Sequence, residues 1–268
     1  MFLRRTGYSG RYAFDVIYSG IQKFMRRGMQ NEALEMCKEF HDFPNALKKR
    51  LVYCICEDCP DLDLVYKVFN TTAKTAADIH QLVKFVPVIC SHMKSRETFY
   101  HFYYLAATGK YSAEPLNVKD SEEAMLSKIV YHLAHGKQDE AIAFFEKHIY
   151  GIPLKRIYNF SGKNRCFFFV LVAYFHRPHL REKCVLQNVP FSFNIDKDFV
   201  MPQYVYDKHV KGGDKSYKFF LENMIMTPCE PFSETSEKAK KIYIETNANG
   251  SFWLDKIAKG EACLTSDE

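Results

Sequence analysis

The sequence predicts a mainly α protein, built from stacked α-hairpins or a helical bundle, with an irregular C-terminal part punctuated by proline and glycine. Apolar residues recur at helical spacing through the first half of the chain. A glycine, an Asx residue and a new helix follow one another at two places. From about residue 180, prolines and glycines divide the chain into short pieces. We therefore expect a helical hairpin domain over residues 1–180. Residues 181–268 are expected to pack on it as an irregular segment or to form a small appended unit.

The first forty residues predict a helical hairpin. Lys23, Arg26 and Arg27 are expected on the face of the first helix opposite its apolar stripe. Gly28 is expected to end that helix, and Asn31 is a candidate N-cap for the next one. The two apolar stripes consist of Ala13, Ile17, Gly20, Ile21 and Phe24, and then of Ala33, Leu34, Cys37 and Phe40.

Pro44 is expected to end the second helix, and a third follows. Its apolar face begins with Leu47, Leu51, Cys54 and Ile55, and its outer face carries Lys48, Lys49 and Arg50. Further helical stretches are expected at residues 62–70, 76–86, 96–107 and 237–244. Residues 166–175 form an apolar run that fits a buried helix, with a strand as the alternative.

The first hairpin has an echo later in the chain. The segment from Gly28 to Leu34 resembles the segment from Gly136 to Ile142, and an amphipathic helix precedes each glycine. Two copies favour stacked α-hairpins. The alternative is that both copies are simply favourable chemistry for starting a helix.

Composition places the chain among globular proteins, with 47% hydrophobic and 26% charged residues. Its longest apolar run is well short of the roughly 20 residues that cross a bilayer, and no apolar block of signal-peptide length follows the first arginines. Nine cysteines form no regular disulfide framework. We expect an intracellular protein, cytoplasmic or nuclear, without a membrane partner. The net charge of +5 permits contact with nucleic acid without requiring it.

Sequence motifs for cofactor chemistry are missing. The Gly-Lys pairs at 109–110 and 162–163 lack the upstream glycine and the following Ser or Thr of a phosphate loop. Cys54, Cys56 and Cys59 would fan around a helix, so buried structural thiols are favoured over a metal site. We expect no enzymatic activity, no cofactor and no bound metal.

Three groups of residues remain as candidate sites. Asp207, Lys208 and His209 lie in the most site-like loop, where a hydrogen-bonded staple is favoured over a general base or metal ligand. The clusters Lys23/Arg26/Arg27 and Lys48/Lys49/Arg50 are candidates for nucleic-acid binding, with a solvated helix exterior as the alternative. Glu57 and Asp58 are adjacent on a helix and point about 100° apart, which favours a helix end over catalysis.

Four segments in conserved order resemble the helical C-terminal region of the MgsA/RarA group of AAA+ ATPases, relatives of clamp loaders. In the first, residues 14–17 lead to Lys23 and Arg26 and then to residues 33–34. In the second, a basic helix ends in the acidic pair Glu57 and Asp58, without the family's glycine.

The third segment of the resemblance ends in Lys94 and Ser95, before the aromatic residues 99–100. The fourth contains Pro202, Tyr204, Asp207, Lys208 and His209, followed by Lys211, Gly212 and Gly213. The ATPase part of the family is absent. The chain is therefore either a fragment of a longer ATPase or a stand-alone derivative without the motor.

The resemblance implies a homo-oligomer, a tetramer in that family, which works at replication forks with DNA and single-strand-binding protein. We accordingly expect a non-enzymatic assembly module of DNA replication or repair. A helical scaffold that binds a protein partner, with no role for nucleic acid, is the alternative. An enzyme built around Asp207 and His209 ranks last, because two residues do not make a site.

Overall fold

A computed structural model describes residues 5–59, 61–96, 100, 131, 132, 140, 143, 185–234 and 237–242. By its internal contacts the chain divides into two compact units. The first comprises Met1–Lys94 and Pro178–Glu230, and the second Ser95–Arg177 and Pro231–Glu268. This division differs from the expected one at residue 180, because residues 178–230 group with the first helices. Apart from the helical residues 237–242, the elements described below belong to the first unit.

Helix α1, Phe14–Arg26, packs against α2 (Gln30–Lys38), α3 (Pro44–Asp58), α6 (Phe85–Ser91) and η3 (Gln203–Val205) of the first unit. Ile17, Ile21 and Phe24 lie on its apolar face and are fully buried. The helix ends as predicted at Gly28, whose φ of +69° is a conformation that favours glycine. The amide of Met29 donates back to the carbonyl of Phe24 and closes the turn.

Helix α2, Gln30–Lys38, begins immediately after that turn and packs against α1. The prediction that Asn31 caps it is wrong: Met29 is the N-cap residue, and no side chain caps the helix. Because the glycine turn already places Met29 at the helix start, Asn31 falls inside the first turn.

Helices α3 and α4 confirm their predicted positions. Helix α3, Pro44–Asp58, has Pro44 in its first turn, where the missing amide proton costs nothing. Helix α4, Leu62–Asn70, begins at Asp61, whose carboxylate accepts a hydrogen bond from the amide of Leu64 at 3.0 Å. Helix α3 packs against both α4 and α1.

The expectation of a single helix over residues 76–86 is wrong. The chain instead forms a 3-10 turn η1, Ala76–Asp78, then α5, Ile79–Leu82, and after a turn α6, Phe85–Ser91. Pro87 explains the break, because it is tolerated in the first turn of a new helix and not in the interior of a longer one.

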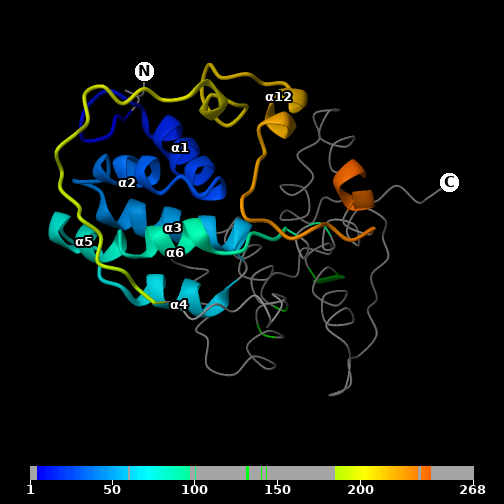
Figure 1. Ribbon diagram of the computed structural model, residues 1–268, viewed down its shortest axis with the longest axis horizontal. Helices are drawn as coiled ribbons and strands as arrows, with labels where there is room; N and C mark the ends of the chain where they lie inside the picture. The colour runs from blue at the N-terminus through cyan, green and yellow to red at the C-terminus, as the bar shows by residue number, and fades with distance from the viewer. Residues whose placement is uncertain are drawn as a thin grey trace. The chain divides into compact units, whose positions relative to one another are not determined.

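Residues 185–230, which we call the strap, follow a long path over the helices (Figure 1). The strap passes α5 and α2, continues near the N-terminus, and returns past α12 to the end of α6. Its regular elements are η3, Gln203–Val205, and α12, Tyr217–Glu222. The carbonyl of Asn194 accepts a hydrogen bond from Lys38 at 2.6 Å, and the amide of Thr227 donates to the carbonyl of Arg26 at 2.7 Å. The strap therefore joins successive helices of the first unit.

The mainly α fold class is confirmed. The described residues contain two isolated β-bridges and no strand. Residues 237–242 are helical, within the predicted stretch 237–244. The predicted helices at 96–107 and 166–175, and the second hairpin around Gly136, lie almost entirely outside the described residues.

Candidate functional site

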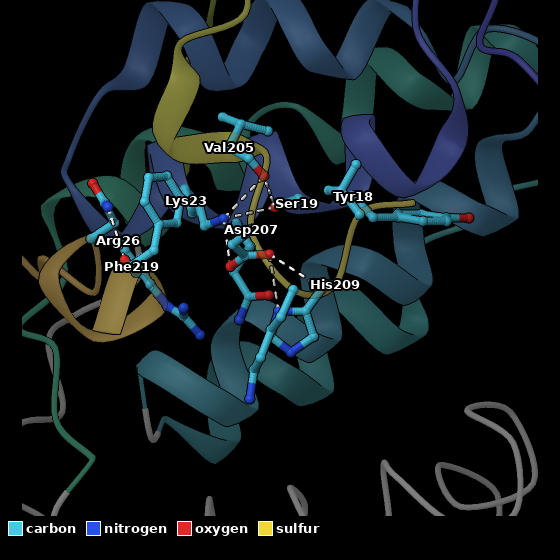
Figure 2. A network of polar contacts seen from close by, with 12 residues as sticks. Tyr18, Ser19, Lys23, Arg26, Val205, Asp207, His209 and Phe219 are labelled. Carbon is cyan, nitrogen blue, oxygen red and sulfur yellow. Dashed lines mark hydrogen bonds and ion pairs between the residues drawn. The ribbon is translucent and has the colours of Figure 1, made fainter. Parts of the chain in front are cut away.

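A buried ion pair joins helix α1 to the strap. Lys23 Nζ lies 2.7 Å from Asp207 Oδ2, and the two residues are 4% and 1% exposed. The ammonium also donates to Ser19 Oγ at 2.9 Å and to the carbonyl of Val205 at 3.1 Å. Figure 2 shows these groups converging on the Lys23 ammonium between α1 and the strap. The charge of Lys23 is thus satisfied entirely within the protein.

His209 completes the environment of Asp207. Its backbone amide donates to Asp207 Oδ1 at 3.0 Å, and its Nδ1 lies 3.2 Å from the same oxygen. Burial raises the pKa of Asp207, but His209 and Lys23 outweigh it and hold that pKa below the ordinary value. Burial lowers the pKa of Lys23 to about 8, against the opposing effect of Asp207. Lys23 and Asp207 therefore form a charged pair at neutral pH.

A second buried network joins α1 to the end of α3. Arg26 Nε lies 2.8 Å from each carboxylate oxygen of Asp58, and Arg26 Nη2 lies 2.8 Å from Glu57 Oε1. Gln22 Nε2 donates to Glu57 Oε2 at 2.7 Å. Burial alone would lower the pKa of Arg26, but Asp58 and Glu57 raise it above its ordinary value. Glu57 and Asp58 are therefore the anionic partners of one buried arginine.

The other two arginines of the predicted basic clusters also have partners inside the protein. Arg50 donates to the carbonyl of Tyr18 and to the side chain of Gln22. The guanidinium carbon of Arg27 lies 4.0 Å from the ring centroid of Tyr204, and Arg27 Nη2 donates to the carbonyl of Asn223 at 2.6 Å. The Arg27 stack ties the end of α1 to the strap.

The prediction that Lys23 and Arg26 lie on an outward face of α1 is wrong. Both are buried, because the strap and the end of α3 cover that side of the helix. Lys48 and Lys49 on α3 are half-buried. Burial lowers the pKa of Lys48, whose Nζ lies 5.2 Å from the ring centroid of Phe69. The structure thus does not assemble the two predicted clusters into one basic surface.

Lys94 closes the end of α6. It is fully buried, and its ammonium donates to the carbonyls of Cys90 and His92 at 2.8 Å each. A positive charge here complements the carbonyls at the C-terminus of a helix. The backbone of Lys94 pairs with the strap, since its amide donates to the carbonyl of Pro228 at 2.9 Å. Ser95, the next residue, is buried as well.

The structure adds residues that the sequence analysis missed. Ser19 and Gln22 lie on the same side of α1 as Lys23 and Arg26, opposite the apolar stripe, and both are buried. His92 is buried, with Nε2 3.4 Å from Asp61 Oδ2 and Nδ1 2.7 Å from the carbonyl of Met93. Nothing in the local sequence pattern pairs His92 with Asp61.

The cysteines of α3 are buried thiols, as expected. Burial raises the pKa of Cys54 to about 12 and raises that of Cys59 well above its ordinary value. Cys59 Sγ contacts the carbonyl of Ile89 at 3.7 Å. In the part of the chain that the structure describes, no cluster of His, Cys, Asp and Glu has the arrangement of a metal site.

The remaining predicted site residues lie in and beside a loop of the strap. Pro202 precedes η3, and the side chain of His209 is 57% exposed next to the buried Asp207. Lys208 Nζ lies 4.4 Å from the ring centroid of Phe220. Of the predicted loop residues, Asp207 faces the helices and His209 faces solvent.

Comparisons with protein-family models, with curated proteins and with solved structures found no significant match. None of the described helices is long and apolar enough to span a bilayer.

Proposed function

We propose that this protein is a non-enzymatic assembly module of a DNA replication or repair system, acting inside the cell as a homo-oligomer. One observation carries the proposal. The charged residues of the resembling segments meet in the first unit as buried ion pairs, Lys23 with Asp207 and Arg26 with Glu57 and Asp58. In the sequence, these segments were related to one another only by the order of their motifs. In the folded protein, complementary charges hold them together.

The burial of these charges favours a structural role over catalysis. A general acid or base must reach a substrate, whereas Lys23 and Asp207 are almost fully buried and are each other's partners. Arg26 is held by two carboxylates in the same way. Ion pairs of this kind fix the relative placement of the elements that carry them. The network therefore suits a module that presents a defined surface.

Self-association follows from the resemblance, and exposed apolar side chains support it. Tyr66 on α4 is 40% exposed, and Val200 and Ile225 on the strap are 77% and 51% exposed. Apolar side chains of this kind enter the buried centre of oligomer interfaces. A tetramer is the state that the resemblance implies.

Light scattering after size-exclusion chromatography tests this proposal on the full chain at low and moderate salt. We expect a discrete oligomer, with a tetramer as the specific expectation. A monomer at all concentrations would contradict the proposal. A Val200→Ser and Ile225→Ser double variant, compared with a Lys67→Gln surface control, measures whether the exposed apolar residues of the strap contribute to the interface.

A second candidate function, a scaffold for a protein partner, is favoured by a group of aromatic rings. Tyr8 is 46% exposed and stacks on His41 with ring centroids 4.3 Å apart, and His41 and His80 both pack against Phe193. Aromatic side chains are frequent anchors of protein interfaces. Recovery of a protein partner that resists nuclease and is lost in Tyr8→Ala would favour this function over the first.

A further inference from the structure

We propose that residues 208–218, here called the basic loop, bind the phosphodiester backbone of a nucleic acid. The inference deepens the proposed function, because it names a DNA-contacting surface for that module. The basic loop contains four lysines, Lys208, Lys211, Lys215 and Lys218, and a single acidic residue, Asp214. Such a local excess of positive charge attracts a polyanion.

Asp15 and Asp207 lie next to the basic loop, and Asp15 Oδ2 accepts a hydrogen bond from the amide of Lys211 at 2.8 Å. Asp207 is 1% exposed and is neutralised by Lys23 from beneath the loop. Asp214 accepts a hydrogen bond from the amide of Ser216 at 2.7 Å, in the turn that leads into α12. With Asp207 paired to Lys23, the four lysines of the basic loop still outnumber Asp15 and Asp214.

The lysines of the basic loop divide into supporting and exposed groups. Lys215 Nζ donates to the carbonyls of Lys208 and Val210, which holds the loop closed. Lys211 is exposed, and its ammonium has no ion-pair partner within the described part of the chain. The side chain of Lys218 is 83% exposed, with Glu222 at 4.0 Å. Lys211 and Lys218 are thus the cations best placed for a ligand.

The backbone of the basic loop is fixed before any ligand binds. The amide of Gly213 donates to the carbonyl of Val210 at 3.0 Å, and the amide of Asp214 donates to the carbonyl of Tyr206 at 2.9 Å. A Cβ at Gly213 would lie 2.3 Å from the carbonyl oxygen of Asp207, so only glycine fits that turn. Gly212, with φ +84°, has no described atom within 4 Å of its Cβ position. A phosphate can therefore approach the backbone closely at Gly212.

The apolar residues of this region favour a polyanion over a bilayer or an apolar protein surface. Val210 is 1% exposed and Phe220 is 6% exposed, so both face inward. The outer side of the basic loop therefore presents lysine side chains and backbone groups. Val210 and Phe220 provide no apolar contact there for a membrane or for the hydrophobic centre of a protein interface. Contacts to phosphates require only positive charge and hydrogen-bond donors. We therefore assign a nucleic acid as the ligand. The basic loop would contact its phosphodiester backbone and would not distinguish base sequences.

Fluorescence anisotropy with a labelled 20-nucleotide single strand, and separately with its duplex, tests this inference between 50 and 200 mM salt. The Lys211→Gln and Lys218→Gln double variant is expected to bind more weakly. For two lost phosphate contacts, the slope of log K against log salt falls by about 1.4 for the single strand and about 1.8 for the duplex. The matched control is Lys67→Gln with Lys197→Gln, which removes the same charge from exposed positions elsewhere.

Several results would overturn the inference. These are no binding by the unmodified protein at 50 mM salt, an equal loss of affinity in the control, or an unchanged salt slope in the loop variant. Competition by poly-glutamate as strong as that by the oligonucleotide would assign the surface to an acidic protein. The oligomeric state of each variant, measured alongside, separates the two proposals. An oligomer that binds no nucleic acid refutes only the assignment of the loop, and a monomer that binds refutes only the assembly function.

Discussion

Arg26 in helix α1 and Asp58 at the end of helix α3 form a buried ion pair in which one guanidinium nitrogen lies 2.8 Å from both carboxylate oxygens. The residues are 5% and 2% exposed. Glu57 binds a second nitrogen of the same guanidinium, and Gln22 bridges the two carboxylates. One arginine thereby fixes how α1 meets α3, and the same helix contacts the strap through Lys23.

Replacing Arg26 with methionine is expected to lower the free energy of unfolding by about 3–5 kcal/mol, because Asp58 stays buried without its cation. Urea unfolding at a fixed protein concentration measures the change. The additional substitution Asp58→Leu is expected to recover part of the loss, since it removes the buried carboxylate of residue 58, while Glu57 still lacks its arginine partner. A loss in Arg26→Met no larger than that in Lys67→Met would show that the pair contributes little.

Asp207 is expected to make stability depend on acid pH. Its folded-state pKa lies below the ordinary value of 3.8, so it stabilises the protein above that pH, and the contribution is lost as the pH falls further. Asp207→Asn is less stable at neutral pH because Lys23 loses its partner, and its stability falls less steeply below pH 4. Unfolding curves of both proteins from pH 7 to pH 2 measure the difference. Parallel curves over the whole range would contradict a charged Asp207 in the folded protein.

Gly28 and Gly10 form a matched pair for testing the turn after α1. Both have positive φ, +69° and +75°, but a Cβ at Gly28 would lie 3.3 Å from the carbonyl oxygen of Thr227 and one at Gly10 would meet no described atom within 4 Å. Alanine at Gly10 is expected to cost about 1–2 kcal/mol through backbone strain alone. Alanine at Gly28 is expected to cost more, since the strap must also shift. Equal losses in the two variants would show that the strap yields freely at Thr227.

Thiol reactivity is expected to follow burial among the described cysteines. Cys229 on the strap is half-buried, whereas Cys37, Cys54, Cys59 and Cys90 are buried, and burial raises the pKa of each of these four thiols. Because the thiolate is the reactive form, an alkylating reagent should modify Cys229 of the native protein before these four. Peptide mapping by mass spectrometry reads the order directly. Modification of Cys54 as fast as Cys229 would indicate that α3 opens readily.

The sequence by itself determined the local architecture. Gly28 ends α1 because its conformation favours glycine, and the apolar stripe of α1 is buried. These features depend on the conformational preferences of single residues and on helical periodicity, which nearby residues specify. The helix boundaries of α4 follow from the same signals. The prediction that Pro44 ends the second helix is wrong, because α2 already ends at Lys38 and Pro44 stands in the first turn of α3.

Only the tertiary structure decided which charged residues are buried and which partners they have. Helical periodicity predicted that Lys23 and Arg26 face solvent. A periodicity argument identifies the apolar face of a helix and assumes that the remaining faces are exposed. The strap and the end of α3 cover that side, and their carboxylates, from Asp207, Asp58 and Glu57, arrive from distant positions in the chain. Which charges are buried is a property of pairs brought together by folding, because an ionised group is tolerated inside a protein only where a partner offsets its desolvation.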